Sequence, residues 1–343
     1  MQKIEYLDSW RGIGCFMVFI SHILDKLYEC GSFFGKSGVA ILFALSAYLL
    51  CELYYWNEKK IDIKWSINFW KKRAIRIFPP LLFTCFIAVL LRWMTIETAI
   101  WQCLMLEQYS HFWVLPLECG FYLLFPIIIY TIKKNGELRS TIIGSIMIIF
   151  IWSYYVFSGP MENTSGFIYC LPMFILGIIV SLISHKIKSI WGGGHNSLRD
   201  IDIFGAIVVI AFESFGLIIY RILRDYDTTD IGKLFENYLE ILRFMVGALI
   251  FAFCLFLIVT GSRLQRLLGN ARWLQKFGKI SYSFYLIHHV LLSKVDMLVK
   301  ICNMNKILIS LFVFSTSIVV ASIMYWGIEV KLGKILRKSM RVI

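Results

Sequence analysis

The sequence predicts an all-α membrane protein, a polytopic bundle of about ten transmembrane helices with both termini in the cytoplasm. Of its 343 residues, 59% are hydrophobic and 17% are charged, whereas soluble proteins average about 45–50% and about 25%. The apolar residues gather in runs of the roughly 20 residues that a helix needs to cross a bilayer. Lysine and arginine concentrate in alternate loops between these runs, as the positive-inside rule expects.

Ten spans are expected along the chain, and each has an apolar run of suitable length. They are Trp10–Tyr28, Gly38–Trp56, Phe78–Ile96, Trp113–Ile132, Thr141–Phe157, Gly166–Ser184, Asp202–Tyr220, Phe244–Gly261, Ile280–Leu298 and Ile307–Trp326. The segment Lys64–Ile77 is shorter and of mixed polarity, which predicts an amphipathic helix on the membrane surface. Residues 1–343 are expected to form a single transmembrane domain with no appended soluble domain.

The charges support this order of spans. With ten spans, 25 of the 35 lysines and arginines fall on one side together with both termini, and that side is predicted to be cytoplasmic. The same asymmetry accounts for the net charge of +13, so we expect no nucleic-acid partner. The nine cysteines include no C-x-x-C pair and fall mostly within apolar runs, so we expect neither a disulfide framework nor a metal site.

The first span carries two ionisable residues, which are costly at membrane depth and mark candidate functional sites. Arg11 and His22 are eleven residues apart, close to three helical turns, so they share one face. A rise of about 16 Å places Arg11 at the cytoplasmic edge and His22 near the middle of the membrane. His22 can then act as a proton acceptor. The alternative is a packing histidine that is hydrogen-bonded to a neighbouring helix.

Further polar residues lie near the ends of other spans. Glu118, just after Pro116 in the fourth span, needs a cation or histidine partner at that depth, unless it is a helix-start charge at the interface. Lys72, Arg73 and Arg76 form a basic cluster, and the two arginines share a helix face suited to phosphate. The alternative for this cluster is a topology anchor or a contact with anionic lipid.

The ninth span also begins with polar residues that cannot face lipid: Ser281, Tyr282, Tyr285, His288 and His289. Tyr285 and one of the two histidines lie within one helical turn of each other. The alternative to a functional role is a polar contact between helices.

These stretches together resemble the membrane acyltransferase 3 family. Leu7–Gly14 followed by His22 resembles the family's N-terminal signature of an arginine and a later histidine. Four further stretches resemble family motifs in the right order: Gly38–Tyr48, Arg73–Pro80, Trp113–Pro126 with Glu118 in the acidic place, and Gly278–His288. The resemblance runs from Tyr6 to about Glu329. It departs at Ala40 and Ala47, and Glu329 lacks the proline that usually follows.

The resemblance implies an enzyme of the bacterial cell membrane that moves an acetyl or other acyl group from cytoplasmic acyl-CoA to a hydroxyl of a cell-surface or lipid-linked glycan. It implies His22 as general base, Glu118 as the group that orients His22, and Arg11 beside the thioester. Arg73 and Arg76, with Lys72, are expected to hold the phosphates of CoA.

Ser281, Tyr282, Tyr285 and His288 are expected to line the same cavity. Acetyl-CoA is expected as a co-substrate, with no tightly bound cofactor, and membrane lipids as the surroundings.

Two other functions compete with this one. A transporter or flippase for a polysaccharide or solute explains the spans and the buried charges, but it leaves the ordered motifs unexplained, and the sequence has no internal repeat. A sensor or assembly subunit that lacks the chemistry is the third reading. Because the chain ends with a basic tail soon after the last span, direct transfer to the acceptor is expected, without a relay domain.

Overall fold

The computed structural model describes residues 5–28, 35–57, 61–157, 166–191, 230–261, 263–295 and 305–339. All regular structure in these ranges is helical, with no strand. In chain order the elements are α1 (Glu5–Tyr28), α2 (Gly35–Leu50), the π-helical η1 (Cys51–Tyr55), α3 (Ile63–Leu90), α4 (Ile96–Cys103), the 3-10 turn η2 (Ser110–Trp113), α5 (Val114–Asn135), α6 (Glu137–Phe157), α7 (Phe167–Trp191), α9 (Asp230–Thr260), α10 (Arg263–Asn270), α11 (Arg272–Leu292), α13 (Lys306–Met324), the π-helical η3 (Tyr325–Leu332) and α14 (Gly333–Ser339).

Within the described residues, six helical stretches are long and apolar enough to cross a membrane: Gly35–Tyr55, Ile63–Leu90, Ser110–Asn135, Glu137–Phe157, Phe167–Ile190 and Lys306–Ser339. A seventh is added if Phe244–Thr260 and Arg263–Asn270, which meet at a bend of 82°, make one span. The prediction of a helical, multi-pass membrane protein is therefore confirmed.

The number of ten spans is not confirmed. Helices α1 and α11 have 24 and 21 residues, long enough to cross, but neither is among these apolar stretches. The expected span Asp202–Tyr220 lies outside the described residues. The cytoplasmic location of the two termini stays a prediction.

The structure corrects the expectation for the segment after residue 62. A separate surface helix over Lys64–Ile77 and a span over Phe78–Ile96 were expected, but α3 is one continuous helix that contains Pro79 and Pro80. Proline inside a membrane helix is tolerated where neighbours satisfy the freed backbone groups. Helix α11 packs beside the prolines, since the Tyr282 hydroxyl donates to the carbonyl of Ile77 at 2.9 Å.

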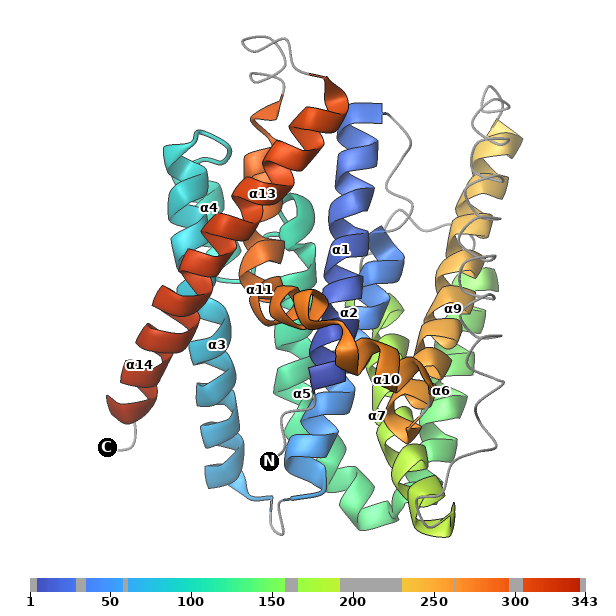
Figure 1. Ribbon diagram of the computed structural model, residues 1–343. Coiled ribbons are helices and arrows are strands. Elements are labelled where there is room, and N and C mark those ends of the chain that lie inside the picture. The colour runs from blue at the N-terminus through green and yellow to red at the C-terminus, as the bar shows by residue number, and fades with distance from the viewer. Residues whose placement is uncertain are drawn as a thin grey trace.

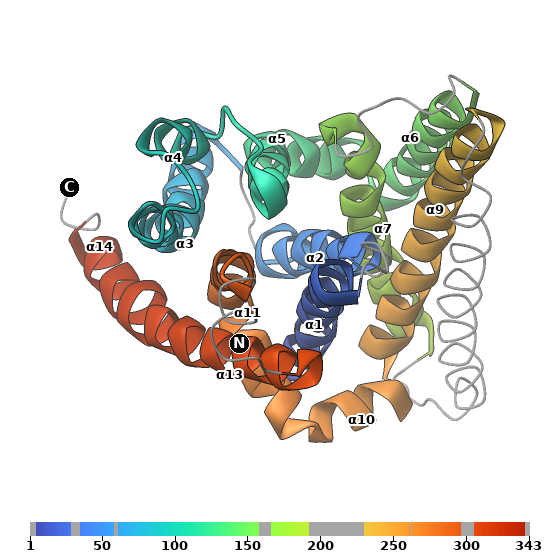
Figure 2. The ribbon, with the colours of Figure 1, turned by 90° about the horizontal axis from the view of Figure 1, so that it is seen from above.

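Helices α1, α2 and α11 lie at the centre of the bundle, and the other helices surround them (Figures 1 and 2). The outer helix α6 exposes large apolar side chains, among them Ile146, Ile149 and Phe150, whereas α11 buries most of its length. Exposed apolar side chains on the outside and polar ones at the centre are expected of a bundle that is surrounded by lipid.

Glycines allow the central helices to approach closely. A Cβ atom on Gly278 of α11 would lie 1.7 Å from the carbonyl oxygen of Asp8 in α1, and one on Gly12 would lie 2.8 Å from that of Leu274. The backbones therefore touch at this crossing, as is common where small residues meet in membrane helices. The contact fixes α1 and α11 side by side, so their later residues also face one another.

Candidate active site

The central contact of the site joins α1 and α11. The Nδ1 atom of His22 lies 2.9 Å from the Nε2 atom of His288, and the two rings are nearly parallel, with centroids 5.1 Å apart and an angle of 6°. His288 is 1% exposed. The two sequence-predicted residues, 266 positions apart in the chain, therefore form one hydrogen-bonded pair.

The backbone determines which nitrogen of each ring carries hydrogen. His288 Nδ1 lies 3.1 Å and 2.8 Å from the carbonyl oxygens of Phe284 and Tyr285, and a carbonyl oxygen can only accept. In neutral His288 the hydrogen is therefore on Nδ1, and Nε2 is an acceptor. His22 must donate to it from Nδ1, which leaves the lone pair of His22 on Nε2.

Two more histidines complete a cluster that sequence reasoning did not assemble. The ring of His111, from η2, lies 5.2 Å from that of His288 and 4.9 Å from that of His289. The His289 ring lies 4.8 Å from that of His22. In the sequence, His111 is marked only by its position two residues before Trp113, where one of the family motifs begins. Among the described residues, no group of three or more His, Cys, Asp or Glu side chains is arranged to hold a metal ion.

Glu118 is placed differently from the expectation. Its Oε1 atom accepts hydrogen bonds from Ser46 at 3.3 Å and from the hydroxyl of Tyr122, while the described partner of His22 is His288. Glu118 is therefore not hydrogen-bonded to His22 in this structure, because α5 and α2 hold the carboxylate on another side of the site.

Arg11 and Arg76 converge on this carboxylate. Arg11 forms an ion pair with Asp8 at 2.9 Å, and it lies close enough to Arg76 and Glu118 to interact with both electrostatically. Arg76 interacts in the same way with Glu118 and with Glu329 of η3. The Arg76 side chain is nevertheless exposed at the surface of the protein. Two neighbouring guanidinium groups that repel each other favour an anionic ligand.

Glu329 was noted in the sequence only as a departure from the family motif. Its Oε1 atom accepts a hydrogen bond of 2.5 Å from Ser283 Oγ of α11. Glu329 lies in the π-helical turn η3, and π-helical turns are frequent at functional sites. The structure thereby connects η3 to both α11 and Arg76.

Arg73 is surrounded by aromatic rings. Its guanidinium carbon lies 5.8 Å from the ring centroids of Tyr54 and Tyr122 and 5.7 Å from that of Phe69. Its Nη2 atom is 3.4 Å from the hydroxyl of Tyr54, and its buried Nε atom has no hydrogen-bond partner. The rings hold the guanidinium by cation–π contacts, and one of its donors is left without a protein partner.

Of the other predicted site residues, some contact neighbouring segments inside the protein and one lies at its surface. Ser281 is buried, and its carbonyl oxygen lies 3.4 Å from the thiol of Cys15. Tyr285 donates from its hydroxyl to the carbonyl of His111. Lys72 is exposed, one residue before Arg73. Tyr282 and Tyr285 thus hold backbone atoms around the site.

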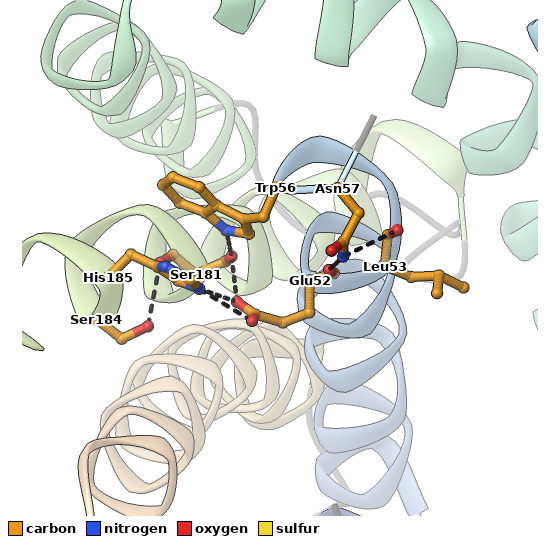
Figure 3. Close-up of polar contacts among 7 residues, drawn as sticks. All are labelled: Glu52, Leu53, Trp56, Asn57, Ser181, Ser184 and His185. Atoms are coloured by element: carbon orange, nitrogen blue, oxygen red, sulfur yellow. Dashed lines mark hydrogen bonds and ion pairs between the residues drawn. The ribbon is translucent and has the colours of Figure 1, made fainter. Parts of the chain in front are cut away.

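A second polar cluster lies between η1 and α7 (Figure 3). Glu52 forms an ion pair with His185 at 3.0 Å and accepts a hydrogen bond from Ser181 at 2.8 Å. Trp56 donates to Ser181 at 3.0 Å and stacks on His185, with ring centroids 3.9 Å apart. These contacts fix the π-helical turn that carries Tyr54, and Tyr54 contacts Arg73.

A separate basic pocket lies at the start of α11. Its lining residues are Glu5, Gly269, Asn270, Arg272, Gln275, Lys276 and Lys279. It shares no residue with the histidine cluster or with the arginines of α3, so its lysines offer control positions for tests of those arginines.

The fold and this site define a multi-pass helical membrane protein with a histidine pair and arginines between its helices. A family model described as an acyltransferase domain, of the acyltransferase 3 type, matches residues 4–326. The chain therefore belongs to this acyltransferase family, as its motifs predicted.

Curated relatives agree with the family. The O-acetyltransferase OatA proteins of Staphylococcus aureus strains NCTC 8325 / PS 47, COL and MRSA252 are each 26% identical to this chain over 173 residues. The match covers 41% of this chain and 28% of each relative, so the chain spans well under half of their length. No solved structure matches the chain.

Proposed function

We propose that this protein transfers an acetyl or other acyl group from acyl-CoA to a hydroxyl group of a glycan, in a bacterial cell membrane. Membership of the acyltransferase family and similarity to O-acetyltransferases support this reaction class. The observation that carries the proposal is the His22–His288 pair, because its hydrogen-bond pattern leaves a lone pair on Nε2 of His22.

His22 is the general base of the proposed reaction. Its Nε2 atom removes the proton of the acceptor hydroxyl as the oxygen attacks the thioester carbonyl and forms the new C–O bond. When the C–S bond breaks, the protonated His22 returns the proton to the sulfur, so CoA leaves as a thiol. His288 keeps His22 in the required tautomer, which is the role that a carboxylate has in other acyl transfers.

The arginines are the proposed donor site. CoA carries phosphates at one end and its thioester at the end of a long arm. The unpartnered Nε donor of Arg73 and the exposed side chains of Arg76 and Lys72 support phosphate binding there. Arg11, on the same helix as His22, is proposed to lie beside the arm or to stabilise charge on the thioester oxygen.

Transfer of label from acetyl-labelled acetyl-CoA to the envelope glycan of the source cell tests the proposal. The purified protein should label the glycan, and His22→Ala should abolish the label at matched protein amount. Transfer by His22→Ala at the wild-type rate would remove the base from the mechanism. A wild-type protein that labels nothing would reject the reaction itself.

A further inference from the structure

His111 has a buried nitrogen without a partner. The side chain is 3% exposed, and its Nε2 atom lies 3.1 Å from the carbonyl oxygen of Leu286. Because that carbonyl can only accept, Nε2 carries the hydrogen, and in the neutral ring Nδ1 is an acceptor. Nδ1 is buried and accepts no hydrogen bond. An unsatisfied buried polar atom costs about 1–3 kcal/mol, so a hydrogen-bond donor from outside the protein would stabilise this site.

The position of His111 is tightly held, so the free nitrogen is not an effect of a loose side chain. The Tyr285 hydroxyl donates to the His111 carbonyl. The His111 ring stacks on that of His289, and the centroid of the Trp93 ring lies 5.8 Å from that of His111, with the two rings tilted by 42°. The His22 ring lies 6.3 Å from that of His111. A group bound at His111 is therefore within the reach of the proposed base.

The backbone before these residues is strained. Arg92 and Ser110 have φ angles of 53° and 50°, a region that side chains other than glycine rarely adopt. Arg92 immediately precedes Trp93, and Ser110 immediately precedes His111. Such strain persists only where the surrounding structure enforces it, and it is concentrated at functional sites.

The histidine cluster and the arginines of α3 are separated along this helix. Arg76 is at the middle of α3, while Trp93 lies three residues after its last residue, Leu90. At 1.5 Å per residue, the helix rises about 21 Å from Arg76 to Leu90. The proposed donor site and a group bound at Trp93 are therefore separate positions along the same helix.

We infer that His111 and Trp93 form the acceptor subsite, in which a hydroxyl group of the sugar donates a hydrogen bond to Nδ1 of His111. This inference rests on the proposed function. A sugar has neighbouring hydroxyls and an apolar ring face, so one hydroxyl binds His111 while His22 deprotonates another, and the ring face packs on Trp93. His111 is a binding residue in this arrangement, and His22 stays the base.

Two substitutions separate the two nitrogens of His111. Glutamine has its amide nitrogen as many bonds from Cα as Nε2 of histidine, so His111→Gln keeps the donor to Leu286 and removes the acceptor at Nδ1. Asparagine has its amide oxygen at the distance of Nδ1, so His111→Asn keeps the acceptor and loses the bond to Leu286. Both substitutions introduce a neutral amide, so they are matched in polarity.

The test measures acetyl transfer from labelled acetyl-CoA to glycan isolated from the envelope of the source cell, at varied glycan concentration. We expect His111→Gln to raise the KM for glycan about three- to tenfold, the effect of one lost hydrogen bond. The KM for acetyl-CoA should not change, because His111 does not contact the arginines of the proposed donor site. His111→Asn should keep the glycan KM within about twofold of wild type while lowering thermal stability.

Three outcomes overturn the inference. A wild-type glycan KM in His111→Gln would show that Nδ1 holds only water. An equal rise of KM in both variants would show a structural role. A wild-type protein that hydrolyses acetyl-CoA but labels no glycan would reject the proposed function itself, and this result is distinct from the other two.

Discussion

The hydrogen bond between His22 and His288 provides the most direct test of the mechanism. In His288→Asn, the amide keeps a donor toward the carbonyls of Phe284 and Tyr285 but no longer reaches His22. In His288→Gln, the amide oxygen takes the position of Nε2 and can still accept from His22 Nδ1. His288→Asn therefore keeps the donor to the two carbonyls and loses the 2.9 Å contact with His22, whereas His288→Gln keeps that contact and loses the donor.

The magnitude follows from that single contact. Without an acceptor, the buried Nδ1–H of His22 is unsatisfied, which costs about 1–3 kcal/mol. The ring escapes this cost by adopting the other tautomer, which removes the lone pair from Nε2. We therefore expect kcat to fall about 10- to 100-fold in His288→Asn, since about 1.4 kcal/mol corresponds to a factor of ten. His288→Gln should retain most of the wild-type kcat.

Steady-state labelling with acetyl-CoA at saturating glycan measures this difference. The KM for acetyl-CoA should stay constant in both variants, since His288 contacts no residue of the proposed phosphate site. If His288→Asn and His288→Gln lost kcat equally, His288 would serve packing alone. If neither lost kcat, the assignment of the tautomer would be wrong.

Three further predictions concern the rest of the site and the fold. Arg73→Gln should raise the KM for acetyl-CoA about tenfold, because a charge-assisted phosphate contact is lost. Lys276→Gln, in the separate basic pocket, should leave this KM unchanged, and equal effects of the two variants in acetyl-CoA titrations would exclude a specific site at Arg73. Gly278→Ala should lower the yield and melting temperature of the folded protein, because its Cβ would lie 1.7 Å from the Asp8 carbonyl oxygen. Gly269→Ala is the control, because a Cβ there meets nothing within 4 Å. Equal melting temperatures of the two variants would contradict the close crossing. Glu52→Gln should cost at most about 1 kcal/mol of stability in thermal melts, since the pair with His185 is partly exposed; a larger loss would show that η1 depends on the full charge.

The sequence alone determined the class of the protein. Its apolar runs, low charge content and loop asymmetry predicted a helical membrane bundle, and the described helices confirm that class. The ordered motifs predicted the acyltransferase 3 family, which the family match to residues 4–326 confirms. The boundary near Pro79 was wrong, because α3 continues through both prolines as one helix. Whether a membrane helix continues through proline depends on the helices packed against it, which the local sequence does not reveal.

The sequence identified most of the residues that make up the site, and the tertiary structure determined which of them contact one another. The motifs selected His22, Glu118 and His288, but they suggested that Glu118 would orient His22. The structure instead pairs His22 with His288 and brings His111 beside them. The periodicity of one helix specifies which residues share a face. The neighbour of that face depends on how helices cross, and here the close approach at Gly278 decided it.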